Sequence, residues 1–119
     1  YVVLKGLTDL SQKRHSAAVE KAVGYMNHHY GEDISLKFLA EMVCKSTNYF
    51  SYIFKKEMGM NYNEYLNEVR IRQAQELLNS TDSMIYEVAE AVGYHDYRYF
   101  TKVFKKIAGC APSEYKKCN

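Results

Sequence analysis

The feature that most restricts how this chain can fold is an internal repeat. At an offset of 49 residues, Ala40, Glu41 and Val43 recur as Ala89, Glu90 and Val92. At an offset of 50, the matches are Tyr49, Phe50, Phe54, Lys55, Lys56, Gly59, Glu64 and Tyr65 with Tyr99, Phe100, Phe104, Lys105, Lys106, Gly109, Glu114 and Tyr115. Self-similarity at a fixed period indicates one structural unit built twice. The offset changes between positions 43 and 49, where a turn is expected and an extra residue is easily accommodated.

The second helix of each copy is expected to bury one face and leave the other polar. Its apolar residues follow the i, i+3, i+4 spacing of a core-facing stripe. They are Phe50, Ile53 and Phe54 in the first copy, and Phe100, Val103, Phe104 and Ile107 in the second. At the same spacing, the opposite face carries Asn48, Ser51, Tyr52 and Lys55 in the first copy, and Arg98, Thr101, Lys102 and Lys105 in the second. Each helix therefore packs on a small core and presents polar groups to a partner.

Capping and stop signals divide the chain into about seven helices and predict an all-α fold. We expect helices over 16–30, 36–43, 48–58, 62–79, 85–92, 97–107 and 112–117, with the polar loop 80–83 supplying the cap of the fifth. The long helix 62–79 links a first helix-turn-helix unit, 16–61, to a second, 80–119. Residues 1–15 are expected to be a linker or the tail of an upstream domain.

Two helix-turn-helix units in one chain favour DNA binding. The motif by itself also occurs as a plain packing unit, but here each copy offers a second helix with a free polar or basic face. At 1.5 Å per residue, the linker helix spans roughly 27 Å. A separation of about 30 Å approaches the ~34 Å between successive major-groove entries on one face of DNA. One chain would then reach two adjacent grooves without dimerising.

The composition argues against other classes of protein. The net charge is only +2, so a DNA-binding surface depends on where the cations lie. Cys44, Cys110 and Cys118 lack the spacing of a zinc module or a disulfide scaffold and fit reduced thiols in a cytoplasm. No apolar run approaches the ~20 residues that cross a bilayer. The scattered histidines and cysteines form no catalytic or metal-binding set, so no enzymatic activity, metal or cofactor is expected.

Residues 93–115 resemble the signature of the AraC/XylS family of bacterial transcription regulators. The family pattern runs approximately G-F-x-D-x-S-Y-F-x-R-x-F-K-K-x-x-G-x-T-P-x-x-Y, and this chain reads GYHDYRYFTKVFKKIAGCAPSEY. The resemblance extends back to about Ala18. It implies a seven-helix domain with two helix-turn-helix motifs bridged by a linker helix, which binds DNA as a sequence-specific activator or repressor.

The resemblance assigns base contacts to six positions on the two polar faces. They are Asn48, Ser51 and Tyr52 in the first recognition helix, and Arg98, Thr101 and Lys102 in the second. Arg98 and Lys102 have the donors for guanine, and Asn48 can pair with adenine. Thr101 or Tyr52 can contact a thymine methyl group. We expect Arg98 to be the strongest single discriminator between bases.

Phosphate contacts are expected beside these positions. The candidates are Lys55, Lys56, Lys105 and Lys106 in the C-terminal halves of the recognition helices, and Ser35 and Ser83 at the starts of the supporting helices. Simple solvation is the alternative for all four lysines, most of all for Lys56 and Lys106, which are expected nearer the core boundary. Plain helix capping is the alternative for the two serines. Arg70 and Arg72 on the linker helix are expected to serve packing or ion pairing with carboxylates and not to contact DNA.

The chain departs from the family pattern at four positions. Arg98 stands where the pattern has Ser, and Lys102 where it has Arg, so the family does not supply the target sequence. Tyr62 replaces a Pro and Ala111 replaces a Thr, both at helix starts where little effect is expected.

The expected partners are double-stranded promoter DNA and RNA polymerase in a bacterial cytoplasm. The missing initial Met favours an output domain of a larger regulator, with a sensor or a response-regulator receiver domain upstream in the same chain. A small free-standing regulator is the alternative arrangement. An all-helical protein-interaction module that does not bind DNA is the alternative function.

Overall fold

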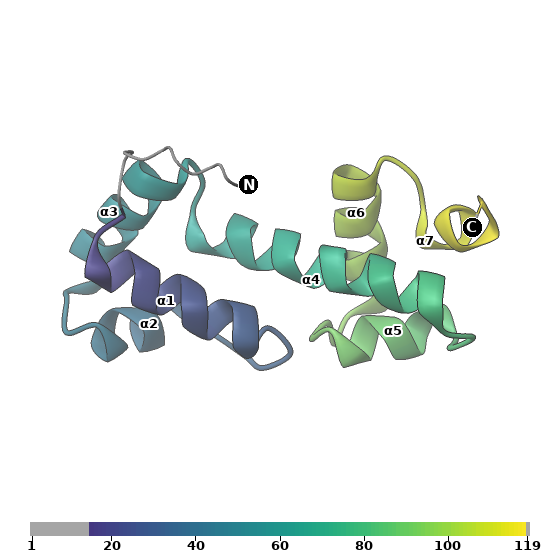
Figure 1. Ribbon diagram of the computed structural model, residues 1–119, viewed down its shortest axis with the longest axis horizontal. Helices are drawn as coiled ribbons and strands as arrows, with labels where there is room; N and C mark the ends of the chain where they lie inside the picture. The colour runs from purple at the N-terminus through teal and green to yellow at the C-terminus, as the bar shows by residue number, and fades with distance from the viewer. Residues whose placement is uncertain (1–14, 119) are drawn as a thin grey trace.

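The computed structural model describes residues 15–118, and every regular element among them is a helix. The seven helices are α1 (Ala17–His28), α2 (Leu36–Met42), α3 (Thr47–Met58), α4 (Tyr62–Ser80), α5 (Ile85–Ala91), α6 (Tyr97–Ala108) and α7 (Pro112–Cys118). In Figure 1, α4 runs between two groups of helices, α1–α3 at one end and α5–α7 at the other. The predicted all-α class is confirmed. The linker expected over 1–15 lies, apart from its last residue, outside the described part of the chain.

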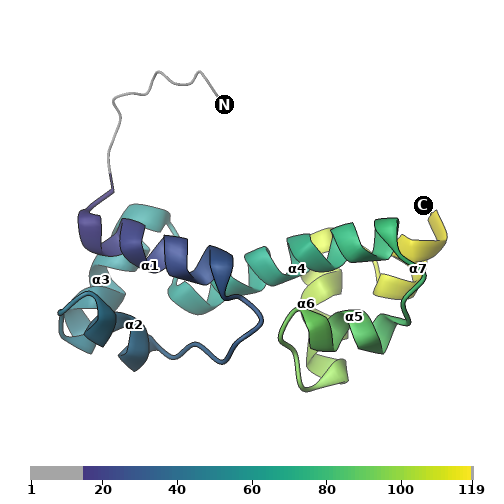
Figure 2. The ribbon, with the colours of Figure 1, turned by 60° about the horizontal axis from the view of Figure 1, so that its bottom comes forward.

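Each group of helices has its own hydrophobic core, and α4 belongs to both. The first core gathers Val19, Ala22, Met26, Ile34, Leu39, Ala40, Phe50, Ile53, Phe54 and Leu66. The second gathers Ile71, Ala74, Leu78, Val88, Ala89, Val92, Tyr94, Phe100, Val103 and Phe104. Since α4 gives Leu66 to one core and Ile71, Ala74 and Leu78 to the other, its apolar residues spread over more than one stripe. Figure 2 shows α4 as one continuous helix linking the two groups.

The repeated residues occupy equivalent places in the two cores. The rings of Phe50 and Phe54 have centroids 5.7 Å apart, and those of Phe100 and Phe104 are also 5.7 Å apart. The second phenylalanine of each pair meets a tyrosine edge-on at 72°, in the pair Phe54 and Tyr65 and in the pair Phe104 and Tyr115. The internal repeat in the sequence is therefore a repeat of packing.

The tight turn within each helix-turn-helix unit is also built twice. Cys44 ends the first turn at φ 61°, and Gly93, 49 residues later, occupies the same place at φ 106°. The backbone N–H after each of them closes the turn at 2.9 Å, from Lys45 to the carbonyl of Ala40 and from Tyr94 to the carbonyl of Ala89. Helices commonly end with a residue in this left-handed conformation, and glycine adopts it without strain.

Side chains fix where most helices begin, because they accept hydrogen bonds from backbone N–H groups that the first helical turn leaves unpaired. Ser16, Ser35, Ser46, Asn61 and Asp96 cap α1, α2, α3, α4 and α6. Glu64 returns a bond to the Asn61 N–H at 3.0 Å, and Glu114 does the same for Ala111 at 3.2 Å. The caps expected at Ser35 and Asp96 and the helix start at Pro112 are confirmed.

Three expectations about the helices are wrong. The first helix ends at His28 instead of reaching residue 30, and His29 stacks back on Tyr25 with ring centroids 4.2 Å apart. The fifth helix is not capped by the polar loop 80–83. Its N-cap is Met84, whose N–H donates to the Glu87 carboxylate at 2.8 Å. Ile107, expected in the core, is 39% exposed and lies outside the second core, although the next residue, Ala108, packs against it.

Within residues 15–118, no helix is long and apolar enough to cross a membrane. The same part of the chain holds no group of three or more His, Cys, Asp or Glu side chains placed to hold a metal ion. Cys44 and Cys110 are free thiols.

Candidate nucleic-acid interface

The two candidate recognition helices, α3 and α6, project from the same side of α4 (Figure 1). Each buries the expected apolar stripe: Phe50, Ile53 and Phe54 in α3, and Phe100, Val103 and Phe104 in α6. Both end in a glycine at positive φ, Gly59 at 79° and Gly109 at 89°. The two helices therefore have equal length, equal packing and an equal C-terminal stop.

The six residues expected to contact bases lie outside both cores. Asn48, Tyr52, Arg98 and Lys102 are exposed, and Ser51 and Thr101 are half-buried. They occupy three equivalent positions, since Asn48, Ser51 and Tyr52 are replaced 50 residues later by Arg98, Thr101 and Lys102. The same three places on two similar helices thus carry different donor and acceptor chemistry, with more positive charge on α6.

The Thr101 hydroxyl is already engaged with its own helix. It donates to the carbonyl of Tyr97 at 3.0 Å. This bond occupies the hydroxyl proton, so Thr101 can offer a partner the hydroxyl oxygen as an acceptor and the methyl group as an apolar contact. The apolar contact suits a thymine methyl.

The lysines expected to contact phosphate are unpaired and exposed. Within the described residues, Lys55, Lys56, Lys105 and Lys106 form no ion pair with a carboxylate. Lys56 lies over the Tyr52 ring, with its Nζ 5.7 Å from the ring centroid, which is cation–π geometry. Their ammonium groups are available to an anionic partner.

The two serines differ in their positions. Ser35 caps α2, because its Oγ accepts from the Phe38 N–H at 3.0 Å. Ser83 was expected at a helix start but lies one residue before the Met84 cap. The Ser83 carbonyl accepts from the Lys116 ammonium at 2.6 Å, which ties the start of α5 to α7.

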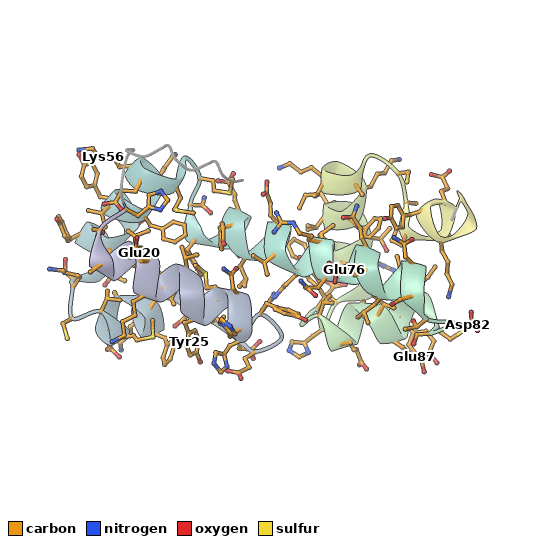
Figure 3. All side chains as sticks on the ribbon, in the orientation of Figure 1. Glu20, Tyr25, Lys56, Glu76, Asp82 and Glu87 are labelled. Carbon is orange, nitrogen blue, oxygen red and sulfur yellow. The ribbon has the colours of Figure 1, made fainter. Side chains whose placement is uncertain are left out.

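Three labelled charged residues can be placed on opposite edges of the molecule. Figure 3 places Lys56 at the edge formed by the recognition helices, whereas Asp82 and Glu87 lie at the opposite edge beside α5. An anionic partner approaching α3 and α6 would therefore stay away from Asp82 and Glu87 but would still meet Glu64 and Glu68 beside Lys102 and Lys106.

A groove of about 400 Å³ lies between α6 and the first turns of α4. Its lining comes from the segment between α3 and α4, the first turns of α4 and one face of α6: Gly59, Met60, Asn63, Glu64, Asn67, Glu68, Tyr99, Lys102, Val103, Lys106 and Ile107. Ile107 thus borders this groove and not the core. The Asn67 amide donates to the Tyr99 hydroxyl at 3.2 Å, so α4 and α6 are joined across the groove floor.

Sequence reasoning did not include the exposed tyrosines at the starts of the recognition helices. Tyr49 is 51% exposed, Tyr97 48% and Tyr99 42%. Their only signal in the sequence is the large number of tyrosines, 12 in 119 residues. The exposed rings of Tyr97 and Tyr99 on either side of Arg98 add apolar surface to the start of α6, beside the candidate base-contact positions.

Known proteins are similar to this chain in sequence. A family model described as a helix-turn-helix domain matches residues 39–117. The chain is 35% identical over 104 residues to the uncharacterized transcriptional regulator YijO of Escherichia coli, which covers 87% of this chain and 37% of YijO. It is 33% identical over 99 residues to the arabinose operon regulatory protein of Escherichia coli, covering 82% and 34%. The chain spans about a third of the length of these relatives.

Solved structures share the fold. The C-terminal domain of AraT, a response regulator from Geobacillus stearothermophilus, superposes with a TM-score of 0.85 at 36% identity, covering 90% of this chain and 89% of that one. The DNA-binding domain of AdpA, described as a global transcriptional factor and solved in complex with a target DNA, superposes with a TM-score of 0.81 at 25% identity. That match covers 87% of this chain and 93% of the other.

Proposed function

The chain belongs to the AraC-type helix-turn-helix family of transcription regulators, and from that premise we propose that α3 and α6 read two successive major grooves of one promoter. The family is one of DNA-binding regulators. One observation carries the proposal beyond the family. Three equivalent positions on α3 and α6 lie outside the cores, the two helices project from the same side of α4, and the lysines beside these positions form no ion pair with another described residue. A duplex offers this surface two grooves and a row of phosphates.

The proposed base contacts follow from side-chain chemistry. Arg98 and Lys102 on α6 donate to guanine O6 and N7, and Asn48 on α3 pairs with adenine. Tyr52 and the Thr101 methyl group supply apolar contact to thymine. We call each recognition helix, with its base-contact positions, a head. The second head, α6, is then equipped for guanine, while the first head, α3, relies on Asn48, apolar contact and the shape of the DNA. Lys55, Lys56, Lys105 and Lys106 contact phosphates, as do Ser35 and Ser83 near the starts of α2 and α5.

Binding should weaken steeply as salt is added. If the four lysines each neutralise one phosphate, log affinity should fall linearly with log salt with a slope of roughly −4. The measurement is fluorescence anisotropy of the chain on a duplex selected from a random pool, over a range of potassium chloride concentrations. Failure to bind any duplex at low salt would contradict the proposal and favour a protein-interaction module.

Replacing Arg98 by alanine should weaken binding by about 1–3 kcal/mol, or roughly 5- to 150-fold, and relax base preference at one position of the site. Repeating the selection from random duplex DNA with the variant measures both effects. Lys105→Ala is the matched control. It should weaken binding to all sequences alike and reduce the salt slope by about one. An unchanged base preference in Arg98→Ala would remove Arg98 from the base-contact set.

For the whole protein, we propose that this domain is the output part of a larger regulator. The relatives are about three times as long as the match, and the matched AraT domain is the C-terminal part of a response regulator. A sensor or receiver domain in the same chain would then control the DNA-binding domain, and RNA polymerase would be the partner at the promoter. Transcription in vitro from a promoter carrying the selected site tests the polymerase link. No change in transcript yield on adding the protein would contradict it.

A further inference from the structure

The two helix-turn-helix units touch each other directly as well as through α4. Arg70, near the middle of α4, points toward the loop that joins α1 to α2. Its Nε donates to the carbonyl of Tyr30 at 2.6 Å, and a terminal nitrogen donates to the carbonyl of Glu32 at 2.8 Å. The guanidinium therefore holds two carbonyls of the first unit. Charged donors make stronger hydrogen bonds than neutral ones.

The other side of the same guanidinium rests on the second unit. Its central carbon lies 5.3 Å from the ring centroid of Tyr94, the residue after the tight turn. Tyr94 is 3% exposed, packs against Phe100 of α6 at 5.4 Å, and donates its hydroxyl proton to the Asn67 amide oxygen at 2.7 Å. Arg70 thus bridges a loop of the first unit to the residue that anchors α6.

The backbones of the two units also approach closely at this point. A Cβ added to Gly93 would lie 2.9 Å from the Tyr30 carbonyl oxygen and 3.0 Å from the Arg70 Nε. A Cβ on Gly31 would lie 3.4 Å from the carbonyl oxygen of Ala91. Figures 1 and 2 both show the α1–α2 loop beside the segment between α5 and α6. We name this contact, made by Tyr30, Gly31, Glu32, Arg70, Gly93 and Tyr94, the brace.

The brace matters because a single connecting helix does not by itself fix the distance and angle between the two units. Long helices curve, and units joined by one element move relative to each other unless a further interface holds them. In the brace, the α1–α2 loop, α4 and the segment between α5 and α6 each contact the other two. The separation and angle between α3 and α6 are then fixed before DNA is met.

We propose that Arg70 is a positioning residue that sets the spacing between the two groove segments that one chain accepts. This inference rests on the proposed function, because it needs α3 and α6 to bind the same duplex. Arg70 contacts no base in this scheme. It acts through the relative placement of the two heads, so its removal changes which spacing is bound and leaves each head able to read its own segment.

The expected effect follows from preorganisation. When the first head has bound, a rigid chain presents the second head at a high effective concentration at one spacing only. A loosened chain presents it at a lower effective concentration over a wider range. Arg70→Ala should therefore weaken binding at the selected spacing by about tenfold. It should also flatten the loss of affinity on changing the spacing.

The experiment uses the full chain and duplexes derived from the site that the unaltered chain selects from random DNA. One series inserts or deletes one to three base pairs between the two contacted segments. Two further duplexes each keep only one segment. Arg72→Ala is the matched control, since Arg72 is exposed on the same helix and has no hydrogen bond or ion pair with another described residue. Circular dichroism verifies that each variant is folded.

The proposal expects Arg72→Ala to keep the unaltered spacing profile and Arg70→Ala to broaden it, with affinities for the single segments changed less than about twofold. Arg70→Lys, which keeps the charge and stem but not the planar fork, should broaden the profile less and serves alone if Arg70→Ala does not fold. An unchanged profile in the folded Arg70 variants, or equal losses on single and double segments, would overturn the inference. Absence of binding by the unaltered chain would instead overturn the proposed function.

Discussion

Replacing Phe104 by alanine is expected to remove about 3–5 kcal/mol of unfolding free energy and to abolish binding to a site that needs both heads. Phe104 is fully buried in the second core, 5.7 Å from the Phe100 ring and 5.6 Å from Tyr115. The loss is large because a domain of this size is stable by only about 5–15 kcal/mol in total. Urea denaturation followed by circular dichroism measures it.

The repeat supplies a matched control for this variant. Phe54 is equally buried and has the equivalent neighbours in the first core. Because the cores are separate, Phe104→Ala should weaken amide-exchange protection mainly in α5, α6 and α7, and Phe54→Ala mainly in α1, α2 and α3. Equal loss of protection in both units from either variant would mean that the molecule unfolds as one core.

Replacing Gly93 by alanine is expected to cost about 3–5 kcal/mol, from a strained backbone and a steric clash together. The backbone is at φ 106°, and the added Cβ would lie 2.9 Å from the carbonyl oxygen of Tyr30 and 3.0 Å from Arg70. The carbonyl belongs to the backbone, so it does not move aside cheaply. Because the clash would push Tyr30 and Gly93 apart, it would also break the brace. The variant should then show the broadened spacing profile that is expected for Arg70→Ala.

Gly109→Ala distinguishes the loss of stability that is caused by backbone strain from the loss that is caused by a steric clash. Gly109 is at φ 89°, but an added Cβ there meets nothing within 4 Å. This variant should cost only the left-handed backbone penalty, about 1–2 kcal/mol. Thermal and urea unfolding of both variants give the difference between them. Equal losses of stability would show that the approach of Tyr30 to Gly93 contributes nothing.

Local signals predicted the helices where local interactions decide them. Ser35 and Asp96 have the side chains that cap helices, and Pro112 suits a first helical position, so these starts were correctly predicted from sequence. The end of the first helix was not. The chain leaves the helix at His28, and the carbonyls of Tyr30 and Glu32 are then bound by Arg70. No local pattern reports a partner that lies 38 to 40 residues away.

Periodicity likewise identified which face of α6 is buried but not where the core stops. Ile107 follows the spacing of Phe100 and Phe104, yet it is 39% exposed and borders the groove beside α4, while Ala108 makes the contact with the core in the last turn. Arg70 was expected to serve packing or an ion pair. It packs, but its hydrogen bonds go to backbone carbonyls and not to carboxylates. The placement of the six candidate base-contact positions outside the cores followed from the pattern, whereas the bases proposed for them depend on docking geometry that a sequence does not contain.

The tight turn of the second unit could replace that of the first unit, but the reverse replacement would not fit. Cys44 tolerates a side chain at its left-handed position because it is exposed, whereas Gly93 faces the Tyr30 carbonyl of the other unit. A glycine-containing turn grafted from the second unit would fit at either place. A cysteine-containing turn grafted from the first would fit only where it already is. The two helix-turn-helix units are therefore not equivalent when such units are recombined into new proteins. A unit placed second in the chain needs a glycine at this turn.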